Sequence, residues 1–215
     1  MLSAGTLCME RRSMKPALFN RQKANGEAFI FERTDWHYVL NTFCFGYRVG
    51  YKFGGSNTGV CNGNLLETGA DACHTSVLVE KSAPMGLLIS NGEFVAMDDE
   101  NPMVVGAGNE GNTTFSNCAF WGHCNQKAII DGRRTATFSD CIFMQWDHNR
   151  EGRNAIRAIG GYVIIRGCNF MTDSPQIFIG EKVSRAVVTG NIVRGKVRID
   201  DQSGNAVVKD NHGSE

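Results

Sequence analysis

The stretch "TTFSNCAFWG" (113–122) recurs 23 residues later as "ATFSDCIFMQ" (136–145), so Cys118 and Cys141 occupy the same position of a nearly repeated decapeptide. Cys168 takes this position again in "VIIRGCNF" (163–170). Looser copies lie at 39–44, 60–65, 89–94, 188–193 and 208–211. A unit of about 20 to 29 residues that repeats along a chain is typical of a solenoid.

A second motif lies between these copies and consists of an apolar–x–apolar pair, as expected of a strand that alternates in and out. It occurs at 29–31, 49–51, 77–79, 105–107, 128–130, 156–158, 177–179 and 197–199. Leu is too sparse for leucine-rich repeats, and no six-residue period is visible. The motifs therefore predict an all-β fold, a right-handed parallel β-helix of about seven coils. We place this domain at 29–215, after an irregular N-terminal segment at 1–28.

The repeated decapeptide then marks the same corner of successive coils. The expected internal columns are Phe115, Phe138, Ile165 and Val188, and beside them Cys118, Cys141 and Cys168, continued by Asn191 and Asn211. Stacked Asn side chains hydrogen-bond along the axis of such a ladder. Cβ atoms in parallel register lie about 4.8 Å apart, longer than the roughly 3.5–4.5 Å span of a disulfide, so the three thiols are predicted to be reduced.

Composition limits the classes of function. Lys plus Arg and Asp plus Glu are both 22, so no basic field favours nucleic acid or an anionic membrane. No apolar run is long enough to span a membrane. The first residues lack the apolar core of a secretion signal, so the protein stays inside the cell, or is secreted or periplasmic and its signal is missing. Cys73 and Cys124 adjoin His residues, but no C-x-x-C pair exists, and we predict no metal site.

Four polar segments between the two motifs are expected to leave one corner of the β-helix, one per coil: 66–76, 96–103, 121–127 and 144–154. The catalytic candidates are Asp71, Asp98, Asp99 and His123, and the substrate-binding candidates are Trp146, Asp147, His148, Arg150 and Arg153. Trp stacks on sugar rings, and paired acids cleave glycosidic bonds. These residues predict a protein that binds a polysaccharide or glycan and cleaves it, against the alternative that the loops are merely polar.

At this point the chain resembles a known superfamily. The segments "VIIRGCNF", "TTFSNCAF" and "AVVTGNIV" are similar to those of the pectin-lyase-like right-handed β-helices, over about 29–211. The resemblance implies the β-helix fold but no single activity. Members of the superfamily include polysaccharide lyases, glycoside hydrolases, esterases, phage tailspike domains and noncatalytic scaffolds.

One branch, the polygalacturonase-like hydrolases, carries Asn-Thr-Asp, Asp-Asp, Gly-His-Gly and Arg-Ile-Lys on nearby coils. The chain has "GAD" ending at Asp71, "DD" at 98–99 and "GH" ending at His123, in the same order. It departs from the pattern because Gly-Ala replaces Asn-Thr, Cys124 replaces the second Gly, and "RID" (198–200) lies several coils away.

The resemblance implies an inverting mechanism without a cofactor. Asp99 would protonate the leaving oxygen, Asp71 would activate water, and His123 would orient an acid. The alternative is a lyase, in which Arg153 or Arg157 is the base. Calcium would then be held by carboxylates, with Asp98, Asp99 and Asp147 as its ligands.

A third hypothesis has no catalysis. β-Helices usually cap their open ends, because an exposed coil presents unpaired strand edges, and 1–28 contains no convincing amphipathic helix. The chain is then an N-terminally truncated member, or a scaffold that forms a homo-oligomer, either a trimer or an end-to-end assembly.

The cysteine ladder predicts the effect of Cys141→Ser. A hydroxyl desolvated in an apolar stack should lower the free energy of unfolding by roughly 1–3 kcal/mol, which denaturant titration measures. An unchanged stability would contradict the ladder.

The hydrolase hypothesis predicts that Asp99→Asn abolishes reducing-sugar release, because the amide has no proton to donate to the leaving oxygen. Stability should change little, because a loop carboxylate supports little of the core. Full activity of the variant on a polysaccharide that the wild type cleaves would exclude Asp99 as the acid.

Overall fold

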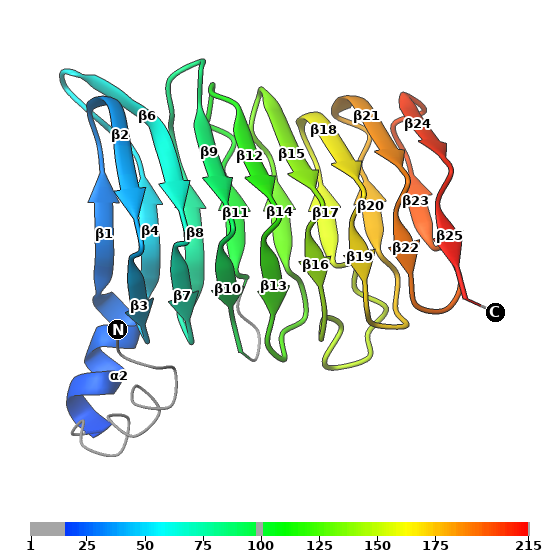
Figure 1. Cartoon of the computed structure of the whole chain (residues 1–215), viewed down its shortest axis with the longest axis horizontal. Helices are drawn as coiled ribbons and strands as arrows, with labels where there is room; N and C mark the ends of the chain where they lie inside the picture. The colour runs from blue at the N-terminus through cyan, green and yellow to red at the C-terminus, as the bar shows by residue number, and fades with distance from the viewer. Residues whose placement is uncertain (1–15, 98–100, 215) are drawn as a thin grey trace.

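The computed structural model describes residues 16–97 and 101–214, and it confirms the predicted right-handed parallel β-helix. Three parallel sheets run along the molecule, and the chain contributes one strand to each sheet per coil (Figure 1). There are eight coils, close to the seven expected. Among the described residues, no helix is long and apolar enough to cross a membrane.

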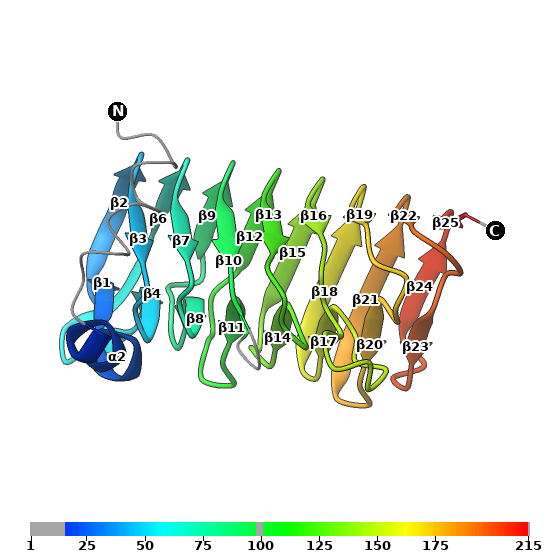
Figure 2. The same ribbon diagram turned by 90° about the horizontal axis from the view of Figure 1, so that it is seen from below.

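The three sheets are named A, B and C in the order in which the chain enters them. Sheet A consists of β1 (Glu27–Phe31), β4 (Val49–Phe53), β8 (Thr75–Val79), β11 (Met103–Val105), β14 (Ala128–Ile130), β17 (Ile156–Ala158), β20 (Ile177–Ile179) and β23 (Ile199–Asp201). Sheet B consists of β2 (Thr34–Leu40), β6 (Gly59–Leu66), β9 (Leu87–Ser90), β12 (Thr113–Ser116), β15 (Thr135–Ser139), β18 (Gly161–Arg166), β21 (Val183–Thr189) and β24 (Ala206–Lys209), and β5 (Gly55–Ser56) pairs antiparallel with β6. Sheet C consists of β3 (Phe43–Phe45), β7 (Gly69–Asp71), β10 (Glu93–Val95), β13 (Ala119–Trp121), β16 (Ile142–Phe143), β19 (Asn169–Phe170), β22 (Ile192–Val193) and β25 (His212–Gly213). Coil 1 is β1, β2 and β3, and coil 8 is β23, β24 and β25; the coils stack side by side along one axis (Figure 2).

The N-terminal segment was predicted to be irregular, but its residues Pro16–Asn25 form the helix α2. Pro is favoured in the first turn of a helix, where its missing N–H is not needed. The helix is held against coil 1: the Phe19 ring lies 6.0 Å from that of Phe45, and the Gln22 amide donates to the Phe45 carbonyl at 2.9 Å. No residue of the helix is buried, which is why the segment lacks the hydrophobic pattern that would have revealed it.

The predicted core column is confirmed. In sheet B, Phe115 pairs with Phe138, Phe138 with Ile165, and Ile165 with Val188, and all four side chains are fully buried. The rings of Phe115 and Phe138 are stacked with centroids 5.4 Å apart. Each coil therefore buries its apolar side chains against those of the coils before and after it.

The corner between sheets B and C has the same construction in every coil. Two residues link the strands, and the first of them is in the left-handed conformation. These first residues are Asn41, Glu67, Asn91, Asn117, Asp140, Gly167, Gly190 and Asp210, with φ between 52° and 67°. Asn, Asp and Gly adopt this conformation most readily. The corner therefore favours Asn, Asp or Gly, which occupy this position in seven of the eight coils, and Glu67 is the exception.

The second corner residue points inward and forms the predicted ladder. None of the seven cysteines among the described residues is in a disulfide. The Sγ of Cys141 donates to the Phe115 carbonyl of the preceding coil at 3.6 Å, and the Asn191 amide donates to the Asn211 side-chain oxygen at 2.8 Å. Contact with the Cys141 thiol, and then burial, raise the pKa of Cys118 well above its usual range, so this thiol stays protonated and unreactive.

The second motif is shifted by two residues in three coils relative to the predictions at 49–51, 105–107 and 197–199. Tyr51 and Met103 are the residues aligned with Val77, and Ile199 is the residue aligned with Ile177. A shift of two keeps every side chain on its own face of the strand. Alternation alone therefore does not distinguish the two registers.

The shift in coil 8 places a carboxylate at an inward position. Asp201 pairs with Ile179, which is fully buried in coil 7. The Ser203 hydroxyl and backbone N–H donate to Asp201 at 2.6 and 3.0 Å, and the hydroxyl bond is the main reason that the pKa of Asp201 lies below its usual value. An inward charge discourages the pairing of an edge strand with another chain.

The left-handed corner predicts the effect of Gly167→Ala. Gly167 has φ +63°, and a Cβ there would lie 2.5 Å from Asp140 Oδ1, so the substitution should cost about 1–2 kcal/mol of unfolding free energy. Gly54→Ala is the control, because a Cβ at Gly54 meets only Glu80 Oε2 at 3.5 Å. The control should be neutral or slightly stabilising. Equal effects of both changes on urea unfolding would contradict this account of the corner.

Candidate functional site

The segments that link sheet C to sheet A vary in length and carry most of the predicted site, and we call this side of the molecule the C–A edge. They are 46–48, 72–74, 96–102, 122–127, 144–155, 171–176 and 194–198. The prediction that successive loops leave one corner agrees with this arrangement. The segment 66–76 is an exception in part, because it also contains a B–C corner and the strand β7.

The predicted catalytic residues follow one another along this edge. Asp71 is the last residue of β7 in coil 2 and is half-buried, and His123 follows β13 in coil 4 and is exposed. Asp98 and Asp99 belong to the linker between these two positions and lie outside the described residues. Asp71 and His123 therefore lie on coils 2 and 4 of this edge, and a catalytic site that joins them to Asp98 and Asp99 stays a prediction.

The structure brings His123 together with residues of the next loop. Its ring centroid is 5.3 Å from that of His148, and its Nε2 lies 3.4 Å from the Gln145 side-chain nitrogen. The Gln145 side-chain oxygen accepts from the Gly122 N–H at 3.1 Å, and the His148 N–H donates to the Cys124 carbonyl at 3.4 Å. Two exposed imidazoles and an amide thus lie side by side on adjoining loops.

Trp146 does not have the exposed position expected of a sugar-stacking residue. Only 2% of its surface is exposed, its indole N–H donates to the Pro175 carbonyl at 2.8 Å, and its ring packs edge-on against Phe170 at 6.0 Å. The longest loop of the edge folds back so that Trp146 extends the core column of sheet C. Its ring faces are therefore covered by protein.

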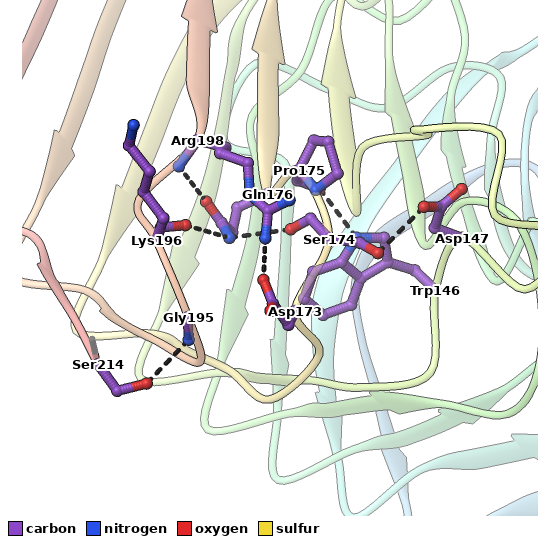
Figure 3. A network of polar contacts seen from close by, with 10 residues as sticks. All are labelled: Trp146, Asp147, Asp173, Ser174, Pro175, Gln176, Gly195, Lys196, Arg198 and Ser214. Carbon is purple, nitrogen blue, oxygen red and sulfur yellow. Dashed lines mark hydrogen bonds and ion pairs between the residues drawn. The ribbon is translucent and has the colours of Figure 1, made fainter.

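Asp147 closes the same loop, as the close-up view in Figure 3 shows for its bond to Ser174. One carboxylate oxygen accepts from the Ser174 hydroxyl at 3.0 Å, and the other accepts from the Arg153 backbone N–H at 2.9 Å. With both oxygens engaged in the fold and the side chain largely buried, Asp147 holds the loop in place, and a role in binding substrate or calcium stays a prediction.

The network continues through the loops of later coils (Figure 3). The Gln176 side chain donates to the carbonyls of Ser174 and Lys196 and accepts from the Arg198 N–H at 2.6 Å. The Arg198 guanidinium pairs with Asp173. These contacts fasten each loop to its neighbour, so the polar residues here serve the fold.

The predicted arginines differ in their surroundings. Arg150 is exposed, and the Arg153 Nε donates to Glu151 at 3.0 Å on the surface of the same loop. Arg157, the alternative lyase base, lies on β17 on the outer face of sheet A, with its guanidinium 5.3 Å from the Phe178 ring centroid. Arg157 thus points outward from sheet A, two residues after the end of the 144–155 loop.

Trp121 is a candidate that the sequence analysis missed. It ends β13, 37% of its surface is exposed, and its indole N–H donates to Glu93 at 2.9 Å. Ile142 lies on the outer face of the next strand of sheet C and is also exposed. The signal was present in "CAFWG", because Phe120 points inward and its neighbour must point outward.

No known protein family matches the sequence, and no curated protein or solved structure matches it either. The fold is that of a parallel β-helix, and membership of the pectin-lyase-like superfamily stays a prediction. Within residues 16–97 and 101–214, no group of three or more His, Cys, Asp or Glu side chains is placed to hold a metal ion.

Proposed function

We propose that the protein binds a polysaccharide where the outer face of sheet C meets the C–A edge, at coils 4 and 5. The observation that carries this proposal is the exposed Trp121 ring, which is tethered by Glu93 directly before the loop of His123. An exposed Trp that is held in one orientation loses little conformational freedom when a ring stacks on it.

The neighbouring groups suit the rest of a sugar. Ile142 is exposed on the next strand of sheet C, where it pairs with Ala119 of the Trp121 strand, while His123, His148 and Gln145 of the following loops offer hydrogen-bond donors and acceptors. A sugar presents an apolar ring face and a rim of hydroxyl groups, and sites of this kind combine an aromatic surface with a few polar side chains.

Cleavage of the bound chain is the second candidate function. It is favoured by the placement of Asp71, the 96–102 linker and His123 on successive coils of one edge. Acid–base hydrolysis by Asp99 and Asp71 needs carboxylates on neighbouring coils. The lyase alternative is less well supported, because Asp147 is engaged in the fold and Arg157 lies on another face.

A noncatalytic scaffold is compatible with the same binding surface. The trimeric or end-to-end assembly and the secreted or periplasmic location stay predictions. Release of reducing ends from a polysaccharide panel supports a hydrolase, and new ultraviolet absorbance from a conjugated double bond supports a lyase. Binding without either signal supports a glycan-binding module.

The proposal predicts that Trp121→Ala weakens binding of the best polysaccharide in that panel by roughly tenfold, because about 1.4 kcal/mol of stacking is lost. Affinity electrophoresis measures the change. Tyr162→Ala is the matched control, because Tyr162 is a similarly exposed aromatic residue on β18 in sheet B, and its removal should leave binding unchanged.

Two results would contradict the proposal. One is the absence of binding to every polysaccharide by the wild-type protein. The other is equal binding by the wild type and Trp121→Ala, which would move the site elsewhere on the β-helix. Circular dichroism of both variants ensures that a loss of binding is not a loss of fold.

A further inference from the structure

Lys127 is a fully buried lysine, and its side chain ends beside a cysteine. None of its surface is exposed, and its Nζ lies 3.0 Å from the Sγ of Cys124, which is equally buried. The same Nζ donates to the Gly122 carbonyl. The backbone of Lys127 is fixed on both sides, because its carbonyl accepts from the Met103 N–H at 3.2 Å and its N–H donates to the Ala155 carbonyl at 2.9 Å.

The charge balance of this pair is unusual. A buried ammonium group needs a counter-charge, and among the described residues no carboxylate forms an ion pair with Lys127. Burial lowers the pKa of Lys127. The group at hydrogen-bonding distance that can exchange a proton with the amine is the Cys124 thiol. The pair is therefore either thiol with neutral amine or thiolate with ammonium.

Cys124 differs in this respect from the cysteines of the ladder. The Sγ atoms of Cys118, Cys141 and Cys168 lie against backbone carbonyls of the preceding coil. Within residues 16–97 and 101–214, no lysine amine lies at hydrogen-bonding distance from those three thiols. The Cys124 Sγ also contacts a backbone carbonyl, that of Gln126 at 3.3 Å, but it contacts a primary amine as well. Cys124 is thus as deeply buried as the ladder cysteines and differs from them in having an amine next to its sulfur.

We propose that Cys124 and Lys127 are a modification site at which hydrogen peroxide generates a covalent sulfur–nitrogen bond. In the first step the Cys124 sulfur attacks peroxide, the O–O bond breaks, and sulfenic acid and water form, so sulfur is oxidised by two electrons and peroxide is reduced. In the second step the Lys127 amine attacks that sulfur. The S–N bond forms, the S–O bond breaks, and the hydroxyl leaves with the amine proton as water.

Cys124 and Lys127 are both fully buried, so the reaction requires peroxide to enter when the surface loop that holds them opens locally. Cys124 lies in the 122–127 loop of the C–A edge, between the exposed His123 and the half-buried Asn125. A sulfenic acid on buried sulfur is ordinarily captured by a nearby nucleophile or oxidised further. With the amine at 3.0 Å, capture requires only a small movement of two side chains in one loop. The proposal does not depend on glycan binding.

The test is mass spectrometry of the full-length protein after treatment with hydrogen peroxide. The S–N bond makes the chain lighter by two hydrogen atoms, about 2 Da. Trypsin cannot cleave after a modified Lys127, so a linked peptide 82–133 should replace the peptides 82–127 and 128–133. Fragmentation should place the link between Cys124 and Lys127, and dithiothreitol should reverse it and restore cleavage.

Cys124→Ser and Lys127→Met should both lose the linked product, and Lys127→Met should give sulfinic or sulfonic acid at Cys124 instead. The ladder cysteines of the same sample are the internal control and should stay thiols. Sulfinic acid without a link in the wild type, or no oxidation of Cys124 at all, would overturn the proposal. If a variant fails to fold, the wild-type protein alone still tests the proposal, because the link between Cys124 and Lys127 is either mapped and reversed by dithiothreitol or is absent.

Discussion

The hydrogen bonds between equivalent backbone groups of successive coils determine the arrangement of everything else in this protein. They run through the sheets and also through the B–C corner, where the N–H of Asn117 donates to the Ser139 carbonyl of the next coil at 2.9 Å. Because the corner keeps two residues in every coil, the inward side chains are brought into columns. The Phe stacks, the thiol ladder and the Asn191–Asn211 bond all depend on that constant register.

The part of the structure that repeats was predictable, because the same physical demand acts on each coil. Phe115, Cys118 and their counterparts face similar surroundings in successive turns, so the sequence repeats the same or similar residues at these positions. The two-residue shift in coils 2, 4 and 8 was not predictable, since both registers bury one face and expose the other. Asp201 shows the consequence, because an apolar pair at 197–199 appeared to be a better fit to the pattern.

The loops were predicted less well, because contacts specific to each loop decide which of their side chains are buried. Trp146 and Asp147 have the composition of a sugar site, yet Pro175 and Ser174 of the next loop bind them into the fold. Trp121 was missed although strand alternation placed it outside. His123 was identified correctly as an exposed edge residue, but its neighbours His148 and Gln145 became apparent only when adjoining loops were seen to touch.

The two sides of each coil differ in how much variation in length they accept. The B–C corner holds two residues in all eight coils, whereas the C–A linkers range from three residues (72–74) to twelve (144–155) without disturbing the stack. Loop length adds little entropic cost on a rigid frame. Each C–A loop can therefore change in length and sequence independently of the others. New binding specificities can arise on this edge while the constant B–C corner keeps the coils in register.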